Sequence, residues 1–146
     1  MPFETGPHIQ AAAFCEQVIE DKTGLLSLIR IIDVITHTEA RPEPPLEMPP
    51  VNWRMKLVLS LKPDRARGRH EIKIVPEEPS GEVEAPMQLS VYMDGEERGQ
   101  NIIFDVAYTF TLEGLYWFQV LFDDALLTKM PFRVKYQRIV QPGKLV

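Results

Sequence analysis

The sequence predicts an all-β protein: a two-sheet antiparallel β-sandwich of immunoglobulin-like architecture, with about eight strands and little helix. Two observations support this prediction. Apolar and polar residues alternate over several separate runs, which is typical of half-buried strands. In addition, 13 prolines are spread over 146 residues, and proline fits the loops and strand edges of a β protein better than a helix.

The clearest alternation lies in residues 113–136. Every second residue is apolar in 116–122 and again in 132–136, and Asp123 and Asp124 separate the two runs. We therefore expect a hairpin with a tight turn. The expected core lies on one face of this hairpin and of the strand before it: Phe104, Val106, Tyr108, Phe118, Val120, Phe132 and Val134.

Four further runs in the middle of the chain alternate in the same way. Residues 53–62, 69–74, 87–93 and 102–112 each have one apolar and one mainly polar face. Each run is predicted to form one strand. Val58 falls on the polar side of its run, so we expect it on an outer face.

The N-terminal segment allows two interpretations. Residues 9–20 fit both an apolar helical stripe and an alternating strand face, with the helix slightly favoured by periodicity. Residues 25–38 are rich in β-branched side chains, which favours a strand. Residues 21–24 between them end in Gly24, which can adopt positive φ, so they suit a hairpin turn.

Two segments are predicted to lack regular structure within a single domain of residues 1–146. Residues 39–51 contain five prolines among acidic residues, and such a segment is expected to cross between the sheets as an extended strap. A proline-rich ligand for an aromatic groove is the alternative interpretation of this segment. Residues 138–146 are expected to form a flexible C-terminal tail.

Four sequence segments carry a resemblance to a known family. They are FCE at 14–16, GLLSLIRIID at 24–33, RGRH at 67–70 and EGLYWF at 113–118. Together they resemble a family of small bacterial proteins known only as an uncharacterised domain. The resemblance implies a β-sandwich that begins with a strand pair, which favours a strand at residues 9–20. It implies no catalytic residue.

Composition limits the classes of function. The net charge of −5 argues against nonspecific nucleic-acid binding, which needs clustered cationic residues. Cys15 is the only cysteine, so an intrachain disulfide is impossible and a cytoplasmic location is expected. No apolar run has the length of a membrane-spanning helix, and the N-terminus lacks the pattern of a signal peptide. We therefore expect neither a membrane nor a nucleic acid as partner.

The strongest local charge feature lies at residues 65–70. Arg65, Arg67, Arg69 and His70 could hold an anion or an acidic partner surface through bidentate hydrogen bonds. A solvated loop balanced by nearby glutamates is the simpler interpretation. If this cluster lined a pocket, it would be the best candidate for a small-ligand site or an enzyme.

No motif indicates catalysis, a metal or a cofactor. The three histidines lack zinc-ligand spacing, and the loop carboxylates lack the pattern of a calcium loop. Cys15 lies in an apolar run where a buried, inert thiol is expected. The sequence also lacks a nucleophile elbow, a phosphate loop and a dinucleotide fingerprint. We therefore expect a noncatalytic protein without a cofactor.

One predicted outer face carries large apolar side chains. In the strand after Gly114, Leu115, Trp117 and Leu121 lie opposite the core face, and such a row is seldom left in water. Either the N-terminal hairpin covers it or a second copy does, about a two-fold axis. The sequence thus predicts a protein-interaction or self-assembly module, expected to be a homodimer.

Overall fold

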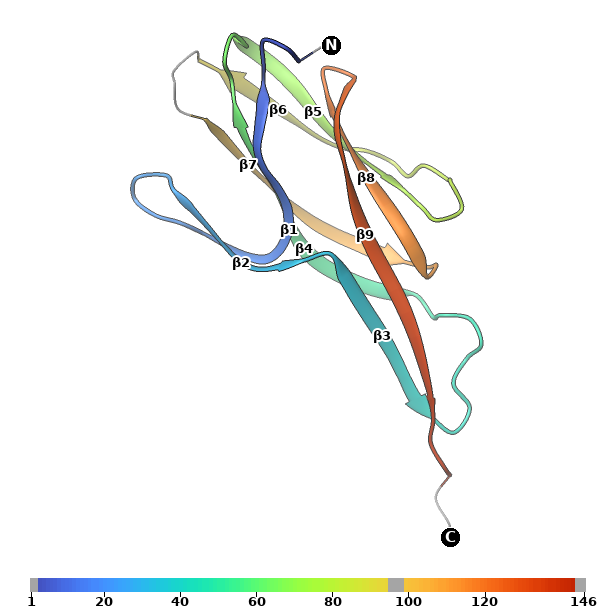
Figure 1. Cartoon of the computed structure of the whole chain (residues 1–146). Coiled ribbons are helices and arrows are strands. Elements are labelled where there is room, and N and C mark those ends of the chain that lie inside the picture. Colours follow the sequence, from blue (N-terminus) through green and yellow to red (C-terminus); the bar gives the residue numbers. More distant parts are fainter. Residues whose placement is uncertain (1–2, 95–98, 144–146) are drawn as a thin grey trace.

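The computed structural model describes residues 3–94 and 99–143, and these residues form nine strands in two sheets and no helix (Figure 1). In this part of the chain, no helix is therefore long and apolar enough to cross a membrane. The first sheet contains β1 (His8–Glu20), β2 (Leu26–Ile32), β4 (Val51–Lys62) and β7 (Gln100–Phe110). The second contains β3 (Val34–Arg41), β5 (Gly68–Glu77), β6 (Met87–Met93), β8 (Gly114–Phe122) and β9 (Ala125–Val140).

The four-stranded sheet has the order β2-β1-β4-β7 and is antiparallel throughout. The strand alternative for residues 9–20 is thus confirmed, because β1 covers them. The sheet curls into a half-barrel that brings the β1–β2 turn back to β7. There the side-chain amide of Asn101 donates a hydrogen bond to the carbonyl of Gly24, at 3.3 Å. Gly24 has a φ of 85°, as its place in the turn requires.

The five-stranded sheet has the order β3-β9-β8-β5-β6, and its β3–β9 pair is parallel. The prediction of a purely antiparallel fold is therefore wrong. Residues 25–38 were expected to form one strand, but they form two, separated at Asp33. Because the chain changes sheets at Asp33, β3 continues away from the hairpin and meets β9 in the same direction. This division gives nine strands where about eight were expected.

The core lies between the two sheets. Phe14 of β1 is in edge contact with Phe118 and Phe132 of the other sheet, at ring-centroid distances of 5.1 and 5.3 Å. Six of the seven predicted core residues are buried, and Tyr108 is partly buried against them. Val58 was expected on an outer face and does lie there, but it is only 1% exposed. The curl of the first sheet explains this, because the β1–β2 hairpin folds over that face.

The predicted hairpin of residues 113–136 is confirmed. β8 and β9 are antiparallel neighbours, with Tyr116 opposite Phe132. Asp123 and Asp124 form the turn with φ values of 49° and 65°. Two successive residues at positive φ are the mark of a type I′ turn, which matches the twist of the strands.

The ends of the irregular segments differ from the expected ones. β3 continues to Arg41 and β4 begins at Val51, so residues 42–50 form the connection between the sheets. β9 continues to Val140 and thus includes the first three residues of the expected tail. The last three residues of that tail, 144–146, lie outside the described part of the chain.

Tyr116 connects the start of β8 to the segment before it. Its ring is fully buried, and its hydroxyl donates to the Leu112 carbonyl at 2.7 Å and accepts from the Leu112 amide at 3.1 Å. The two bonds connect Tyr116 to backbone four residues upstream. They fix the entry of the chain into β8.

Tyr116→Phe should lower the free energy of unfolding by about 1–3 kcal/mol, because two backbone groups of Leu112 lose their partner while the ring still fills its site. Chemical denaturation monitored by tryptophan fluorescence would measure this loss. An unchanged midpoint and slope would show that the hydroxyl contributes nothing to stability.

Candidate functional site

The predicted basic cluster lies at the loop that joins β4 to β5. Arg67 folds back over this loop, and its Nη1 donates to the carbonyls of Asp64 and Ala66 at 2.6 and 2.9 Å. Arg65 and Arg69 are exposed. Arg69 lies in β5 opposite Tyr92 of β6. Of the three arginines, Arg67 is thus the one that the loop itself engages.

His70 is held on both sides by groups of the protein. Its Nδ1 lies 2.5 Å from Oδ2 of Asp123, and its Nε2 lies 2.7 Å from the carbonyl oxygen of Arg67. The ring also stacks on Phe122 at a centroid distance of 4.7 Å. Each ring nitrogen therefore lies beside an acceptor oxygen of the protein. The ring thus joins the β4–β5 loop to the β8–β9 turn and has no free nitrogen for a substrate.

Asp123 connects the same turn to β5. Burial acts to raise the pKa of its carboxyl group, but the Glu71 amide, which donates to Oδ1 at 2.9 Å, and His70 outweigh it. The net effect is a pKa below the usual value. The backbone of Asp123 also donates to the Glu71 carbonyl at 2.9 Å. The carboxylate is therefore part of the structure of the turn.

The Asp123 contacts should make stability depend on pH in the acid range. A carboxyl group with a lowered folded-state pKa stabilises the fold above its unfolded value of about 3.9, and this contribution disappears as the pH falls through the folded value. We expect wild type to lose more stability than Asp123→Asn between about pH 5 and pH 2.5. Urea unfolding across this range would measure the difference. Parallel pH profiles would contradict the assigned role of the carboxylate.

The predicted interface residues Leu115, Trp117 and Leu121 lie together on the outer face of β8, each partly buried. The β1–β2 hairpin belongs to the other sheet. Neighbours from β9, and not that hairpin, cover part of the row. The ammonium group of Lys129 lies 5.4 Å from the ring centroid of Trp117, and Pro131 lies opposite Trp117 in the strand pair.

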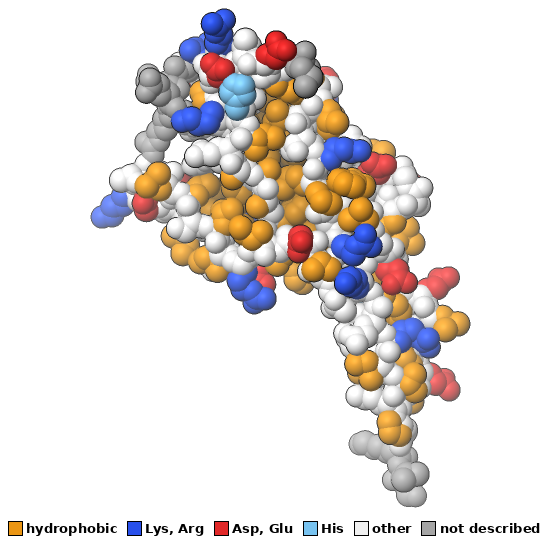
Figure 2. Space-filling model, in the orientation of Figure 1, with side chains coloured by type: hydrophobic (Ala, Val, Ile, Leu, Met, Phe, Trp, Pro, Cys, Tyr) orange, Lys and Arg blue, Asp and Glu red, His pale blue; other side chains and the backbone are white. Residues whose placement is uncertain are grey.

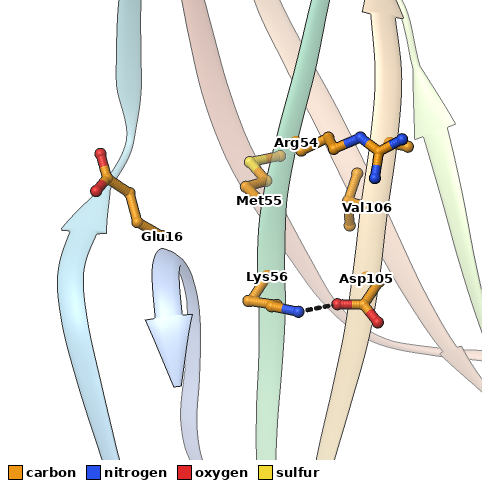
Figure 3. A pocket seen from close by; sticks show the side chains of 7 residues that line it. Glu16, Arg54, Met55, Lys56, Asp105 and Val106 are labelled. Atoms are coloured by element: carbon orange, nitrogen blue, oxygen red, sulfur yellow. Dashed lines mark hydrogen bonds and ion pairs between the residues drawn. The ribbon is translucent and has the colours of Figure 1, made fainter. Parts of the chain in front are cut away.

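A charged cleft of about 320 Å³ lies on the outer face of the four-stranded sheet (Figure 3). Lys56 of β4 pairs with Asp105 of β7, and Glu16 of β1 lies 3.5 Å from Arg30. The thiol of Cys15 is buried beside Lys56, and burial raises its pKa, which leaves it protonated and unreactive. Among residues 3–94 and 99–143, no cluster of three His, Cys, Asp or Glu side chains could hold a metal ion.

A second cleft of about 480 Å³ lies between the curled hairpin and its own sheet. Leu26 and Leu28 of β2 face Ala11 and Val58 across it, and Ser60 lies at its polar end. The hydroxyl of Ser60 is 2.7 Å from Oδ1 of Asn101. The small alanine side chain leaves this space open.

The most unusual element is a two-stranded ribbon that projects from the two packed sheets (Figures 1 and 2). β8 begins at Gly114, opposite Val134, so β9 from Lys135 onward has only β3 as a strand neighbour in the described structure. The sequence pattern did not predict this element. The residues of β3 were expected to end one strand at 25–38 and to begin the strap at 39–51.

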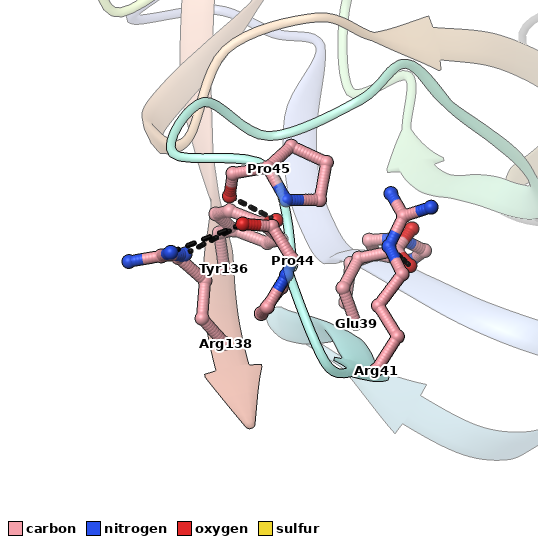
Figure 4. A network of polar contacts seen from close by, with 7 residues as sticks. Glu39, Arg41, Pro44, Pro45, Tyr136 and Arg138 are labelled. Atoms are coloured by element: carbon pink, nitrogen blue, oxygen red, sulfur yellow. Dashed lines mark hydrogen bonds and ion pairs between the residues drawn. The ribbon is translucent and has the colours of Figure 1, made fainter. Parts of the chain in front are cut away.

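The proline-rich strap 42–50 packs against one side of this ribbon (Figure 4). The hydroxyl of Tyr136 donates to the Pro45 carbonyl at 2.7 Å, and the guanidinium of Arg138 donates to the Pro44 carbonyl at 3.0 Å. Pro44 is buried by these contacts. The strap therefore shields the β9 side of the ribbon, while β3 stays at the edge of the sheet.

Comparisons with known proteins give a family but no activity. Residues 10–135 match the model of a family described as a family of unknown function, DUF6941. No curated protein matches the chain. Among solved structures, it is similar to the Pseudomonas fluorescens alkylpurine DNA glycosylase AlkC bound to DNA containing an abasic site analog. The identity is 12% and the TM-score 0.45, over 86% of this chain and 31% of that one. The chain thus spans about a third of the length of that structure, and so distant a likeness carries no argument about role.

Proposed function

The chain belongs to DUF6941, a family of unknown function, and on its own geometry we propose that it is a noncatalytic protein-interaction or self-assembly module. Its partner is a protein, either another copy in a homodimer or a different chain. The observation that carries this proposal is the projecting β3–β9 ribbon. Two strands alone are marginally stable in water, so the ribbon gains from a further strand.

The local chemistry agrees with a noncatalytic role. Both ring nitrogens of His70 are engaged with acceptors of the protein. The thiol of Cys15 is fully buried and its pKa is raised. A catalytic base or nucleophile needs a free, accessible atom, and neither side chain offers one.

The proposal also includes an immunoglobulin-like architecture and a bacterial, cytoplasmic setting. The Tyr116–Leu112 hydrogen bonds support the first, because such a link to backbone a few residues upstream is the tyrosine corner of Greek-key sandwiches. The single free cysteine supports the cytoplasm, where thiols stay reduced. The resemblance to small bacterial proteins supports the bacterial origin.

Site-specific photocrosslinking in cells would test this role. A benzophenone amino acid would replace Thr36 on the exposed side of β3, and Ser90 on the edge strand β6 would serve as the matched control position. We expect a protein adduct from position 36 that Thr38→Pro abolishes, and none from position 90. Equal crosslinking at both positions, or none at position 36, would contradict the proposal.

A further inference from the structure

We propose that β3 pairs with β3 of a second copy, antiparallel about a two-fold axis, and so joins two five-stranded sheets into one continuous sheet. This inference rests on the proposed function and names its partner. The adjoining edges would be identical, as a closed dimer requires. Addition of a strand at a free edge is an established mode of protein recognition.

Among the residues that the structure describes, β9 is the only strand that pairs with β3, so the other edge of β3 has no strand partner. The Asp33 carbonyl accepts from the Arg133 amide at 2.9 Å, and the Arg41 carbonyl accepts from the Gln141 amide at 3.1 Å. Odd-numbered residues of β3 therefore direct their backbone groups to β9. By alternation, even-numbered residues direct theirs outward. These residues are Val34, Thr36, Thr38 and Ala40, and all four are exposed.

The other edge strands are less suited to self-pairing. β2 contains Arg30, whose φ of 55° distorts the strand locally. β7 carries Asp105 at its centre, and an inward or central charge protects an edge. β6 is shorter than β3, with Ser90 at its middle. β3 has neither a proline nor a left-handed residue, and its outward positions are uncharged.

The charged residues at the two ends of β3 select one register for the pairing of the two copies. When Thr36 lies opposite Thr38 of the second copy, Val34 lies opposite Ala40, and every outward backbone group of β3 has a partner. The same register places Asp33 opposite Arg41 at both ends, which joins opposite charges. On the two-fold axis, His37 then faces His37 of the second copy. Within each chain, Nε2 of His37 lies 3.1 Å from Oε1 of Glu39.

Two neighbouring registers also place the outward backbone groups of the two β3 strands opposite each other, but both give less favourable contacts. A shift in one direction places Asp33 opposite Glu39 of the other copy, which opposes like charges. A shift in the other direction places Arg41 opposite Ile35 and leaves Asp33 without a partner. Each shift also leaves outward backbone groups at one end of the strand unpaired. Pairing of β3 is therefore specific in register as well as in partner.

Sedimentation equilibrium of the purified full chain would test the pairing through Thr38→Pro. Proline removes the outward amide of Thr38 and obstructs the approach of a second strand, yet every β3–β9 backbone hydrogen bond is kept. Within the monomer, only the exposed side-chain bond from Thr38 Oγ1 to Gln137 Oε1, at 3.3 Å, is lost. We expect a wild-type dimer whose Kd rises at least about tenfold in the variant. Ser90→Pro removes an outward amide from β6 in the same way, and it should leave the Kd unchanged.

A charge exchange tests the register. Asp33→Arg places like charges opposite each other at both ends and should raise the Kd about tenfold. The double variant with Arg41→Asp restores opposite charges and should return the Kd to near the wild-type value. Circular dichroism would verify that each variant retains its β structure. Without such rescue, the proposed register is wrong.

Several outcomes would overturn the self-pairing itself. A wild-type chain that stays monomeric at its highest soluble concentration would do so. If Thr36 still crosslinked to a different protein in cells, the proposed interaction role would stand and only the identity of the partner would fail. A dimer that Trp117→Lys dissociates and Thr38→Pro leaves intact would place the interface on β8 and would likewise exclude β3.

Discussion

Replacing Phe14 by alanine should lower the free energy of unfolding by about 3–5 kcal/mol, the largest effect expected for a single side chain here. Phe14 is 3% exposed, and it is the aromatic residue of the first sheet that packs between Phe118 and Phe132 of the second. Its loss removes a large buried apolar surface and two edge contacts at once. The resulting cavity would lie between the two sheets, and its size would add to the loss.

Guanidinium unfolding would measure this loss, with Phe3→Ala as the matched control. Phe3 is only partly buried, and its ring meets Phe122 at the rim of the core at 6.1 Å. The control should therefore lose markedly less stability. Equal losses for the two variants would mean that Phe14 does not bridge the sheets.

Gly114→Ala is expected to lower the free energy of unfolding by about 2–4 kcal/mol through two separate effects. Gly114 has a φ of 133°, a conformation that disfavours any residue with a β-carbon. A β-carbon there would also lie 2.9 Å from Cγ of Pro79, which is closer than van der Waals contact allows. Gly114 begins β8 opposite Val134, so the strain would fall on the central hairpin.

Gly68→Ala separates the two effects. Gly68 also has a positive φ, of 86°, but a β-carbon there would meet no atom within 4 Å. Its substitution should therefore cost only the conformational part, about 1–2 kcal/mol. Thermal unfolding of both variants would give the comparison. If Gly68→Ala cost as much as Gly114→Ala, the contact with Pro79 would have no energetic role.

Local patterns predicted most of the individual strands. The Tyr116–Phe122 alternation and the Asp123–Asp124 break were enough to locate the β8–β9 hairpin, because side-chain period and turn chemistry are both local properties. The same holds for the Asp21–Gly24 turn, where Oδ1 of Asp21 accepts from the Thr23 amide at 2.8 Å. Such features need no knowledge of the rest of the chain.

Pairing between distant strands could not be predicted in this way. Asp33 shows no local sign that the chain changes sheets there, and the parallel pairing of β3 with β9 depends on that change. Val58 shows the same limit. Its position on the outer face followed from alternation, but its burial results from the curl of the β1–β2 hairpin, which is a property of the whole sheet.

The candidate sites follow the same division. The sequence indicated Arg67 and His70 as a basic cluster, but their hydrogen bonds to backbone carbonyls and to Asp123 appear only in three dimensions. Leu115 and Trp117 lie on an outer face, as alternation predicted. No sequence pattern indicated the free edge of β3, because the position of a strand in its sheet depends on which other strands pair with it.

The β3–β9 pairing also constrains the order in which the protein can fold. In the sequence, all other strands of their sheet lie between β3 and β9. Pairing β3 with β9 therefore closes one of the longest loops in the chain, with a corresponding loss of chain entropy. Topologies rich in such distant contacts fold slowly. During synthesis β3 emerges long before β9, so this pair can close only after the last strand of the chain has been made. In this interval a chaperone, or the β3 of a neighbouring nascent chain, could occupy the place that β9 takes later.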